Sequence, residues 1–307
     1  MTDWLSGNRR FLLRFVGTLL AIGLIVLLLR GQGWDEILKA FKQLSFSQIL
    51  LAFVLILCSR FCVVLRWYIL LRAGNVRISF SDALALTFTG LFSNNFLPTT
   101  IGGDVVRLAG AMQLGYDRAV SLASLVADRL VGALAMIFTL PFGLIPAWHI
   151  LFPVSAASAM AAPPIFQKTW DFIQRTLQTF SIWFKKPLSL FAAFACTWGH
   201  VLCTCIALAV LVSALGGHMS FWLIVGLWSI SYFVTLIPIS INGYGVQELS
   251  LTFLFSTVGG ISTAVGLTLA VLIRVFYMVA SLPGAVYMPA ILSAMDIERE
   301  PESKDAL

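Results

Sequence analysis

The sequence predicts an all-α polytopic integral membrane protein made of two inverted repeats, each with a re-entrant helical hairpin. Hydrophobic residues make up 59% of the 307 residues and charged residues only 11%, with a mean hydropathy of +0.93. Soluble domains are about one quarter charged. Several apolar runs reach the roughly 20 residues that cross a bilayer as a helix. A Pro-hydroxyl-Ile-Gly motif also occurs twice, in "NNFLPTTIGGDVVRL" from Asn94 and in "TLIPISINGYGVQEL" from Thr235.

The apolar runs define the expected elements in order. Residues 11–29 follow Arg9 and Arg10, are long for a signal-peptide core and have no small-residue cleavage site, so we expect a retained anchor helix. Residues 30–44 form an amphipathic connecting segment. Further spans are predicted at 48–71, 119–145, 188–215 and 262–290. Residues 149–166 form a weaker span, because the run is short and contains Pro153, Pro163 and Pro164.

These elements divide the chain into five parts. We predict an N-terminal anchor helix with its connecting segment (1–46), membrane repeat 1 (47–145), a connecting span and cytoplasmic loop (146–186), membrane repeat 2 (187–292) and a charged C-terminal tail (293–307). No part of this sequence is left for a sizeable soluble domain.

The two repeats match at ordered positions beyond the shared motif. Chance similarity explains matching apolar runs, but it poorly explains glycine, hydroxyl and proline matches that keep one order. The corresponding positions are Gly74/Gly216, Ser79/Ser220, Pro98/Pro238, Thr100/Ser240, Ile101/Ile241, Gly103/Gly243 and Arg129/Arg274. We therefore predict an internal duplication.

Each motif is expected to interrupt a helix. Pro98 lacks a backbone N–H, and Gly103 admits conformations that a helix does not use, so the helix starting near Ser79 must stop here. The next limb carries Asp104 and Arg107 and is too short and polar to cross the bilayer alone. Both motifs are interpreted as tips of re-entrant hairpins, whose broken backbone lines a polar cavity or is buried in protein.

The start of the first hairpin has the pattern of a capping box. Ser79 precedes Asp82 by three positions, so each side chain is placed to bond the other residue's backbone N–H. Asp82 is therefore interpreted as a helix cap and not as a catalytic acid.

Charge predicts the topology. The net charge of +6 comes from Lys and Arg at the ends of apolar runs and not from a basic stripe, which excludes a nucleic-acid partner. With a cytoplasmic N-terminus and re-entrant hairpins, the loops rich in Lys and Arg fall inside and the 216–219 connector falls outside. We predict the cell (inner or cytoplasmic) membrane. The repeats are inverted only if 149–166 crosses; otherwise they are parallel.

No metal or cofactor is predicted. The five cysteines lie inside apolar runs without the spacing of metal ligands, and a Walker motif is absent from the sequence. We expect the five cysteines to be buried and reduced. These residues are Cys58, Cys62, Cys196, Cys203 and Cys205.

The candidate site lies between the repeats. Broken helices that meet near the midplane are typical of secondary transporters, where half-helix N-termini face anionic groups. The surplus of arginine over acidic residues in the membrane segments favours a substrate that bears phosphate. The predicted substrate-binding residues are Arg60, Arg66, Asn94, Asn95, Pro98, Thr100, Gly102, Gly103, Arg107, Asp128, Arg129, Pro238, Ser240, Asn242, Gly243, Glu248 and Arg274.

Structural roles are the alternative for several of these residues. Arg66 would snorkel beside Trp67, Asp128 would pair with an arginine, and Glu248 would neutralise Arg274. His200, which aligns near Arg60, is expected to be a buried hydrogen-bonding residue. The second motif has Gln247 and Glu248 where the first has Arg107, so we expect the two hairpins to differ electrostatically.

The motifs resemble a known family. "NNFLPTTIGGDVVRLAGA", "ASLVADRLVGALAM", the "RW" at Arg66 and Trp67, and "PISINGYGVQE" are similar to the flippase-like transmembrane region of lysylphosphatidylglycerol synthases and their stand-alone relatives. The resemblance covers nearly the whole chain after the first helix. It implies lipid translocation, or work alongside polyprenyl-linked sugar and hopanoid pathways. The synthases carry a soluble aminoacyl-transferase domain after this region, and this sequence ends at Leu307 without one, so we expect no aminoacyl transfer.

The sequence and the resemblance together predict a flippase-like lipid transporter that is not an enzyme. It would move an anionic phospholipid or a polyprenyl-phosphate-type lipid between leaflets. One alternative is a non-catalytic membrane partner of a separate lipid-modifying synthase or glycosyltransferase. Another, ranked lower, is an intramembrane enzyme on lipid-linked substrates with Glu248 or Asp128 as general base. The sequence shows no metal cluster, Ser/His pair or paired-carboxylate motif for that chemistry.

Overall fold

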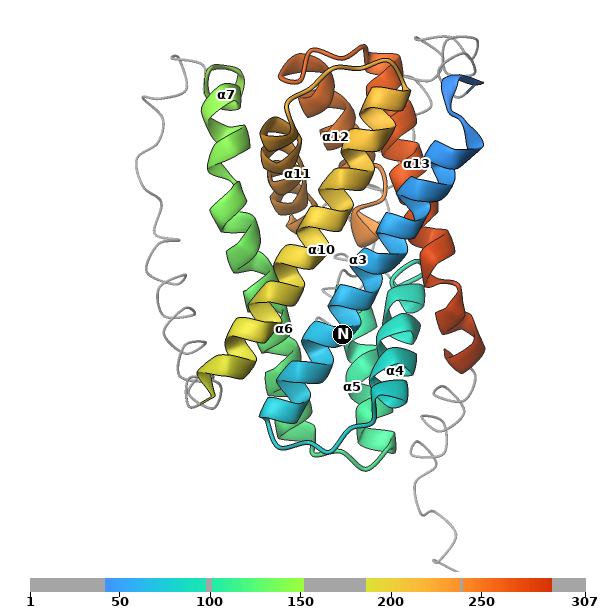
Figure 1. Cartoon of the computed structure of the whole chain (residues 1–307). Helices are drawn as coiled ribbons and strands as arrows, with labels where there is room; N and C mark the ends of the chain where they lie inside the picture. Colours follow the sequence, from blue (N-terminus) through green and yellow to red (C-terminus); the bar gives the residue numbers. More distant parts are fainter. Residues whose placement is uncertain (1–41, 98–100, 152–185, 238–239, 289–307) are drawn as a thin grey trace, which may run out of the picture.

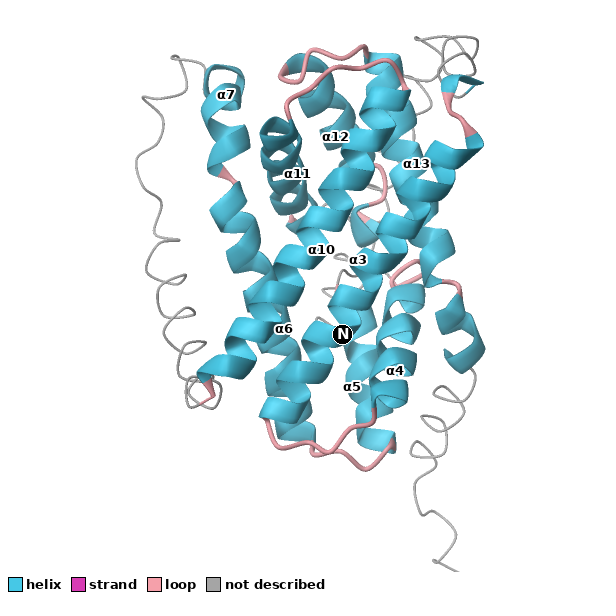
Figure 2. Cartoon of the chain, viewed as in Figure 1, coloured by secondary structure: helices cyan, strands magenta, loops and turns pink. Residues whose placement is uncertain are grey.

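The computed structural model describes residues 42–97, 101–151, 186–237 and 240–288. Within these ranges the chain forms helices joined by short loops, without strands, as Figure 2 shows. The all-α prediction is confirmed. The predicted anchor helix at 11–29, most of the weak span at 149–166 and the tail at 293–307 lie outside the described residues.

Four helices of the described chain are long and apolar enough to cross a membrane. They are α3 (Phe46–Ala73), α6 (Arg118–Thr139), α10 (Pro187–Ala214) and α13 (Thr263–Ser281). Three start at a residue whose side chain accepts from the first turn: Ser45 at α3, Asp117 at α6 and Ser262 at α13. These helices match the predicted spans, and the protein is a polytopic integral membrane protein.

Two predicted spans end earlier than expected. The run at 119–145 is not one helix, because α6 ends at Thr139 and a new helix, α7 (Pro141–Leu151), starts at Pro141. The run at 262–290 is likewise interrupted at Leu282, directly before Pro283. Proline has no N–H to donate, so one helical hydrogen bond is missing at each break, although Leu140 and Leu282 keep right-handed helical φ and ψ. Both corrections therefore follow from residues that were visible in the sequence.

Helices α3 and α10 pack against each other along their length, and Figure 1 shows this pair in front of the other helices. Polar side chains link them, since Ser59 Oγ lies 2.6 Å from His200 Nδ1 and 3.0 Å from Thr204 Oγ1. Interhelical hydrogen bonds of this kind are typical of membrane bundles. The structure confirms that His200 is a hydrogen-bonding residue.

Two helical hairpins lie behind this pair in Figure 1. The first consists of α4 (Phe80–Ser93) and α5 (Gly102–Gln113). The second consists of α11 (Phe221–Leu236), the short helix η2 (Ile241–Gly243) and α12 (Val246–Thr257). Figure 1 shows the open ends of the hairpins at opposite ends of the molecule and their turns toward its middle. The re-entrant placement in a bilayer and the inverted relation of the repeats stay predictions.

Glycines allow the closest contacts between helices. A Cβ on Gly103 of α5 would lie 2.2 Å from the carbonyl oxygen of Gly90 in α4. A Cβ on Gly226 of α11 would lie 1.9 Å from the backbone nitrogen of Gly143 in α7. Both distances are far below contact, so these backbones meet directly, as small residues permit in membrane proteins.

The capping box predicted at the first hairpin forms only in part. Ser79 Oγ accepts from the backbone N–H of Asp82 at 3.1 Å. The Asp82 carboxylate instead accepts from the Tyr116 hydroxyl at 3.1 Å. Tyr116 follows α5, so this bond joins the two limbs at the open end of the hairpin. Asp82 therefore has a structural role, although not the reciprocal one that the pattern predicted.

Candidate functional site

A cavity of about 290 Å³ lies where the two hairpin turns meet the long helices. The first hairpin contributes Asn94 and Asn95 from its turn, and the second contributes Asn242 and Gln247. Hairpin helices of both repeats and the long helices α3, α6, α10 and α13 supply the rest of the lining. The cavity thus lies between the two predicted repeats, where the sequence placed the site.

Ten of the predicted site residues line this cavity. They are Arg60, Arg66, Asn94, Asn95, Gly103, Arg107, Asp128, Arg129, Asn242 and Arg274. Three others, Pro98, Thr100 and Pro238, lie outside the described residues. The structure therefore brings ten of the predicted residues to one cavity, and their role in substrate binding stays a prediction.

Four predicted site residues do not line the cavity. Gly102 packs against the side chain of Leu97, and Ser240 is buried. The Gly243 carbonyl accepts from Arg274 Nη2 at 3.3 Å, and Glu248 forms an ion pair with the same arginine. Gly243 and Glu248 therefore hold a lining residue without being part of the lining themselves.

The sequence prediction also missed residues of the lining. They include Thr87, Gly90, Asp104, Gly132, Met136, Thr197, His200, Trp228, Tyr232, Thr235, Gln247, Tyr277 and Ser281. Helical spacing could have found several, because Thr87, Gly90 and Asn94 share one face of α4. Trp228, Tyr232 and Thr235 share one face of α11 in the same way.

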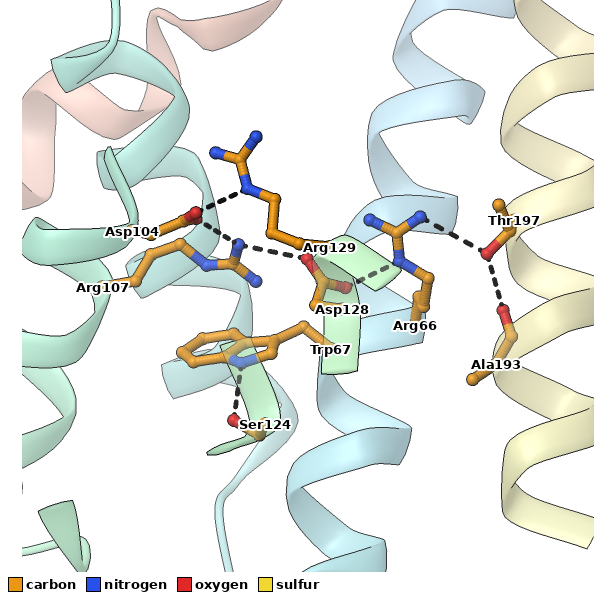
Figure 3. Close-up of polar contacts among 9 residues, drawn as sticks. All are labelled: Arg66, Trp67, Asp104, Arg107, Ser124, Asp128, Arg129, Ala193 and Thr197. Carbon is orange, nitrogen blue, oxygen red and sulfur yellow. Dashed lines mark hydrogen bonds and ion pairs between the residues drawn. The ribbon is translucent and has the colours of Figure 1, made fainter. Parts of the chain in front are cut away.

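Asp128 is the centre of a buried ion-pair network between α3, α5 and α6 (Figure 3). Its Oδ1 accepts from Arg66 Nε at 2.6 Å, and its Oδ2 accepts from Arg107 Nη1 at 3.3 Å. All three side chains are buried. The expected pairing of Asp128 with an arginine is thus confirmed. Arg66 does not snorkel beside Trp67, because it is held in this network.

Trp67 supports the network from one side. The guanidinium carbon of Arg107 lies 4.1 Å from the centre of the Trp67 ring, a cation–π contact. The ring is fixed in turn, because Trp67 Nε1 donates to Ser124 Oγ at 3.1 Å. Figure 3 shows these contacts together with a bond from Arg66 Nη1 to Thr197 Oγ1 at 3.3 Å. Both residues of the "RW" pair therefore belong to this charge network, Arg66 through its bond to Asp128 and Trp67 through its contact with Arg107.

An ion pair with the same arrangement joins each hairpin to a long helix. Asp104, the third residue of α5, accepts from Arg129 Nε of α6 at 2.6 Å. Glu248, the third residue of α12, accepts from Arg274 Nε of α13. The expected neutralisation of Arg274 by Glu248 is confirmed. Pairing Gly103 with Gly243 in the sequence does not align Asp104 with Glu248. The two acids are equivalent because each is the third residue of its helix.

The hairpin helices offer fewer free N–H groups to an anion than the sequence suggested. Asn94 Oδ1 accepts from Gly103 N at 2.7 Å at the start of α5. Glu248 Oε2 accepts from Gly245 N at 2.8 Å at the start of α12. An acid in each first turn also offsets the positive end of the helix dipole. The arginines, and not the helix N-termini, therefore supply the positive charge of the cavity.

Positive charge exceeds negative charge around the cavity. Among the described residues, five arginines line it: Arg60, Arg66, Arg107, Arg129 and Arg274. The carboxylates that pair with them in the described chain are those of Asp104, Asp128 and Glu248. The balance is positive, and the site can hold an anion.

An Arg-lined cavity between two helical hairpins in a bundle of membrane-spanning helices defines an integral membrane protein with a positively charged cavity. The sequence matches the family described as the lysylphosphatidylglycerol synthase TM region over residues 14–284, and the chain belongs to this family. The resemblance seen in its motifs is confirmed.

Two curated relatives are membrane proteins of archaea. A UPF0104 membrane protein of Methanothermobacter thermautotrophicus is 30% identical over 152 residues, which is 48% of this chain and 42% of the relative. A UPF0104 membrane protein of Pyrococcus horikoshii is 25% identical over 132 residues, or 42% of this chain and 38% of the relative. The chain thus matches about two fifths of the length of each relative.

Proposed function

We propose that this protein is a flippase-like lipid transporter that binds an anionic headgroup in the Arg-lined cavity. The surplus of positive charge in a cavity inside a membrane bundle is the observation that carries the proposal. Ionised side chains are costly in a membrane interior and mark substrate pathways there. An anionic phospholipid or a polyprenyl-phosphate-type lipid supplies the missing negative charge.

The size of the cavity supports a headgroup and not a whole lipid. Its volume of about 290 Å³ is at the lower end of small-molecule pockets, which span roughly 300–1,000 Å³. A phosphate with a small substituent fits this space, whereas acyl or isoprenoid chains would stay in the bilayer. Rocking of the two repeats around the cavity would expose it to each leaflet in turn.

We further propose that the chain has no catalytic activity of its own. A general base must be free to take a proton from a substrate. Asp128, Asp104 and Glu248 are each committed to at least one guanidinium group. The alternative function is that of a non-catalytic membrane partner of a separate synthase or glycosyltransferase. If that alternative is right, the purified chain alone would move no lipid.

Transport by the purified protein tests the proposal. We expect proteoliposomes to move a fluorescent anionic phospholipid between leaflets faster than protein-free vesicles. Arg274→Gln should slow this transport about tenfold or more, because hydrogen bonds to charged groups contribute about 1.5–3 kcal/mol. The measurement is the loss of fluorescence when a membrane-impermeant reductant is added.

Glu248→Gln is the matched variant, because Arg274 lines the cavity and its partner Glu248 is not part of the lining. Both changes break the same ion pair, so both should lower thermal stability in detergent. Only Arg274→Gln removes the charge that would contact the headgroup, and it should lose more transport than Glu248→Gln. Equal losses of transport and stability would show that the pair is only structural.

We also propose that the protein lies in the cell membrane with its N-terminus in the cytoplasm. In a background without native cysteines, Arg77→Cys and His218→Cys should react with an impermeant thiol reagent from opposite faces, Arg77→Cys from the cytoplasm. Both positions are exposed, and Figure 1 shows their loops at opposite ends of the molecule. Labelling of both from one face would rule out this topology.

A further inference from the structure

Arg60 of α3 differs from the other arginines of the cavity. Arg66, Arg107, Arg129 and Arg274 each contact a carboxylate. Within the described part of the chain, Arg60 contacts none. Its guanidinium carbon lies 3.9 Å from the centre of the Tyr277 ring instead, and its Nε is buried without a hydrogen-bond partner. A guanidinium group held in this way in a membrane interior attracts an anion.

A second unpaired donor contacts the same tyrosine as Arg60. Trp228 of α11 lines the cavity and packs edge-to-face on Tyr277, with ring centres 6.2 Å apart. Its Nε1 is buried and has no hydrogen-bond partner among the described residues. Arginine and tryptophan side chains donate hydrogen bonds and cannot accept them. This end of the cavity therefore fits a group rich in acceptor oxygens, such as a phosphate.

The rest of the polar lining cannot neutralise a cation. The carboxylates of Asp104, Asp128 and Glu248 are already bound to arginines. Other polar groups of the described lining carry no negative charge. They are the imidazole of His200, which is hydrogen-bonded to Ser59, and amides and hydroxyls such as those of Asn94, Asn95, Asn242, Gln247, Thr87, Thr197 and Thr235. An ammonium group in this space would face a surplus of guanidinium charge without a free counter-charge.

We infer that the cavity selects a headgroup with net negative charge and no ammonium group, whose phosphate lies against Arg60 and Trp228. This inference rests on the proposed transport function and narrows its substrate class. Phosphatidylglycerol has the required chemistry, whereas phosphatidylethanolamine carries the same phosphate next to an ammonium group. The two lipids therefore differ in the feature that the cavity discriminates.

The test compares these two lipids in proteoliposomes of phosphatidylcholine. Both carry the same fluorescent acyl chain, so the label and the hydrophobic part are equal. Phosphatidylglycerol should cross about tenfold faster than phosphatidylethanolamine or more. Equal rates, or faster phosphatidylethanolamine, would overturn the selectivity and leave transport itself standing. If neither lipid crosses faster than in protein-free vesicles, the proposed function fails and this inference fails with it.

Arg60→Gln tests the position of the phosphate. The ratio of the two transport rates should fall by about fivefold or more toward equality, because the variant loses the charge that favours the anionic lipid. This ratio does not depend on the fraction of correctly folded protein, so a merely structural role for Arg60 would leave it unchanged. Arg72→Gln is the control, since Arg72 lies exposed on the last turn of the same helix. An unchanged ratio in Arg60→Gln would overturn the assignment of the phosphate to Arg60.

Discussion

Gly103→Ala is expected to destabilise the protein strongly and to stop transport. The added Cβ would lie 2.2 Å from the carbonyl oxygen of Gly90 and 2.7 Å from the side-chain amide of Asn94. A carbonyl oxygen within a helix cannot rotate away, so α4 and α5 would have to separate. Overpacking of this kind typically costs about 1–3 kcal/mol, and backbone contacts fall at the upper end or above it. Thermal unfolding in detergent and lipid flux measure the two effects.

Gly243 should respond differently, although it occupies the corresponding place in the second motif. Its φ is +70°, and the nearest atom to an added Cβ would be 3.5 Å away. The cost of alanine is therefore conformational, about 1–2 kcal/mol for a left-handed L-residue. Gly243→Asn should retain more stability and transport than Gly243→Ala, since asparagine tolerates this region. Equal effects of the two changes would show that φ is not the reason for glycine here.

Asp128→Asn is expected to cause the second large loss of stability. The carboxylate binds Arg66 and Arg107, and all three side chains are buried. Removing one charge of a buried ion pair typically costs about 3–5 kcal/mol, because the partners are left uncompensated. We expect a clear drop in the thermal midpoint and poor yield of folded protein.

A double-mutant cycle with Arg66→Met separates this cause from a general loss of packing. Methionine removes the Arg66 charge, so Asp128→Asn should cost less in the Arg66→Met background than in the wild type. Arg107 still keeps its contact with Asp104 at 3.1 Å. Additive effects of the two changes would contradict an electrostatic centre at Asp128, as would a wild-type midpoint for Asp128→Asn alone.

The sequence was sufficient for most of the fold, because length and hydropathy decide which segments cross a bilayer. It placed the two hairpins correctly through the repeated motif, since Pro98 and the glycines leave few helical alternatives. The breaks before Pro141 and Pro283 lie inside runs whose hydropathy alone predicts continuous spans, and only the missing proline N–H marks them. A proline inside an apolar run therefore predicts a helix break from sequence alone.

The site was harder to predict, because its key contacts join distant helices. Arg60 and Tyr277 meet through the packing of α3 near α13, and no local pattern reveals that contact. The pairs Asp104–Arg129 and Glu248–Arg274 also depend on where α5 and α12 begin. The surplus of arginine was nevertheless visible in the composition of the membrane segments, and it indicated the correct charge of the cavity.

Among the described residues, the charge network around Asp128 has no equivalent in the second half of the chain. When Arg129 is aligned with Arg274, Asp128 aligns with Ile273. Arg107 and Leu251 correspond in the same way, because each is the sixth residue of its helix, α5 or α12. Both Ile273 and Leu251 are buried and apolar. If the two halves exchange roles during alternating access, this network favours one of the two end states over the other. The protein would rest in one orientation, and a bound headgroup would have to offset that bias.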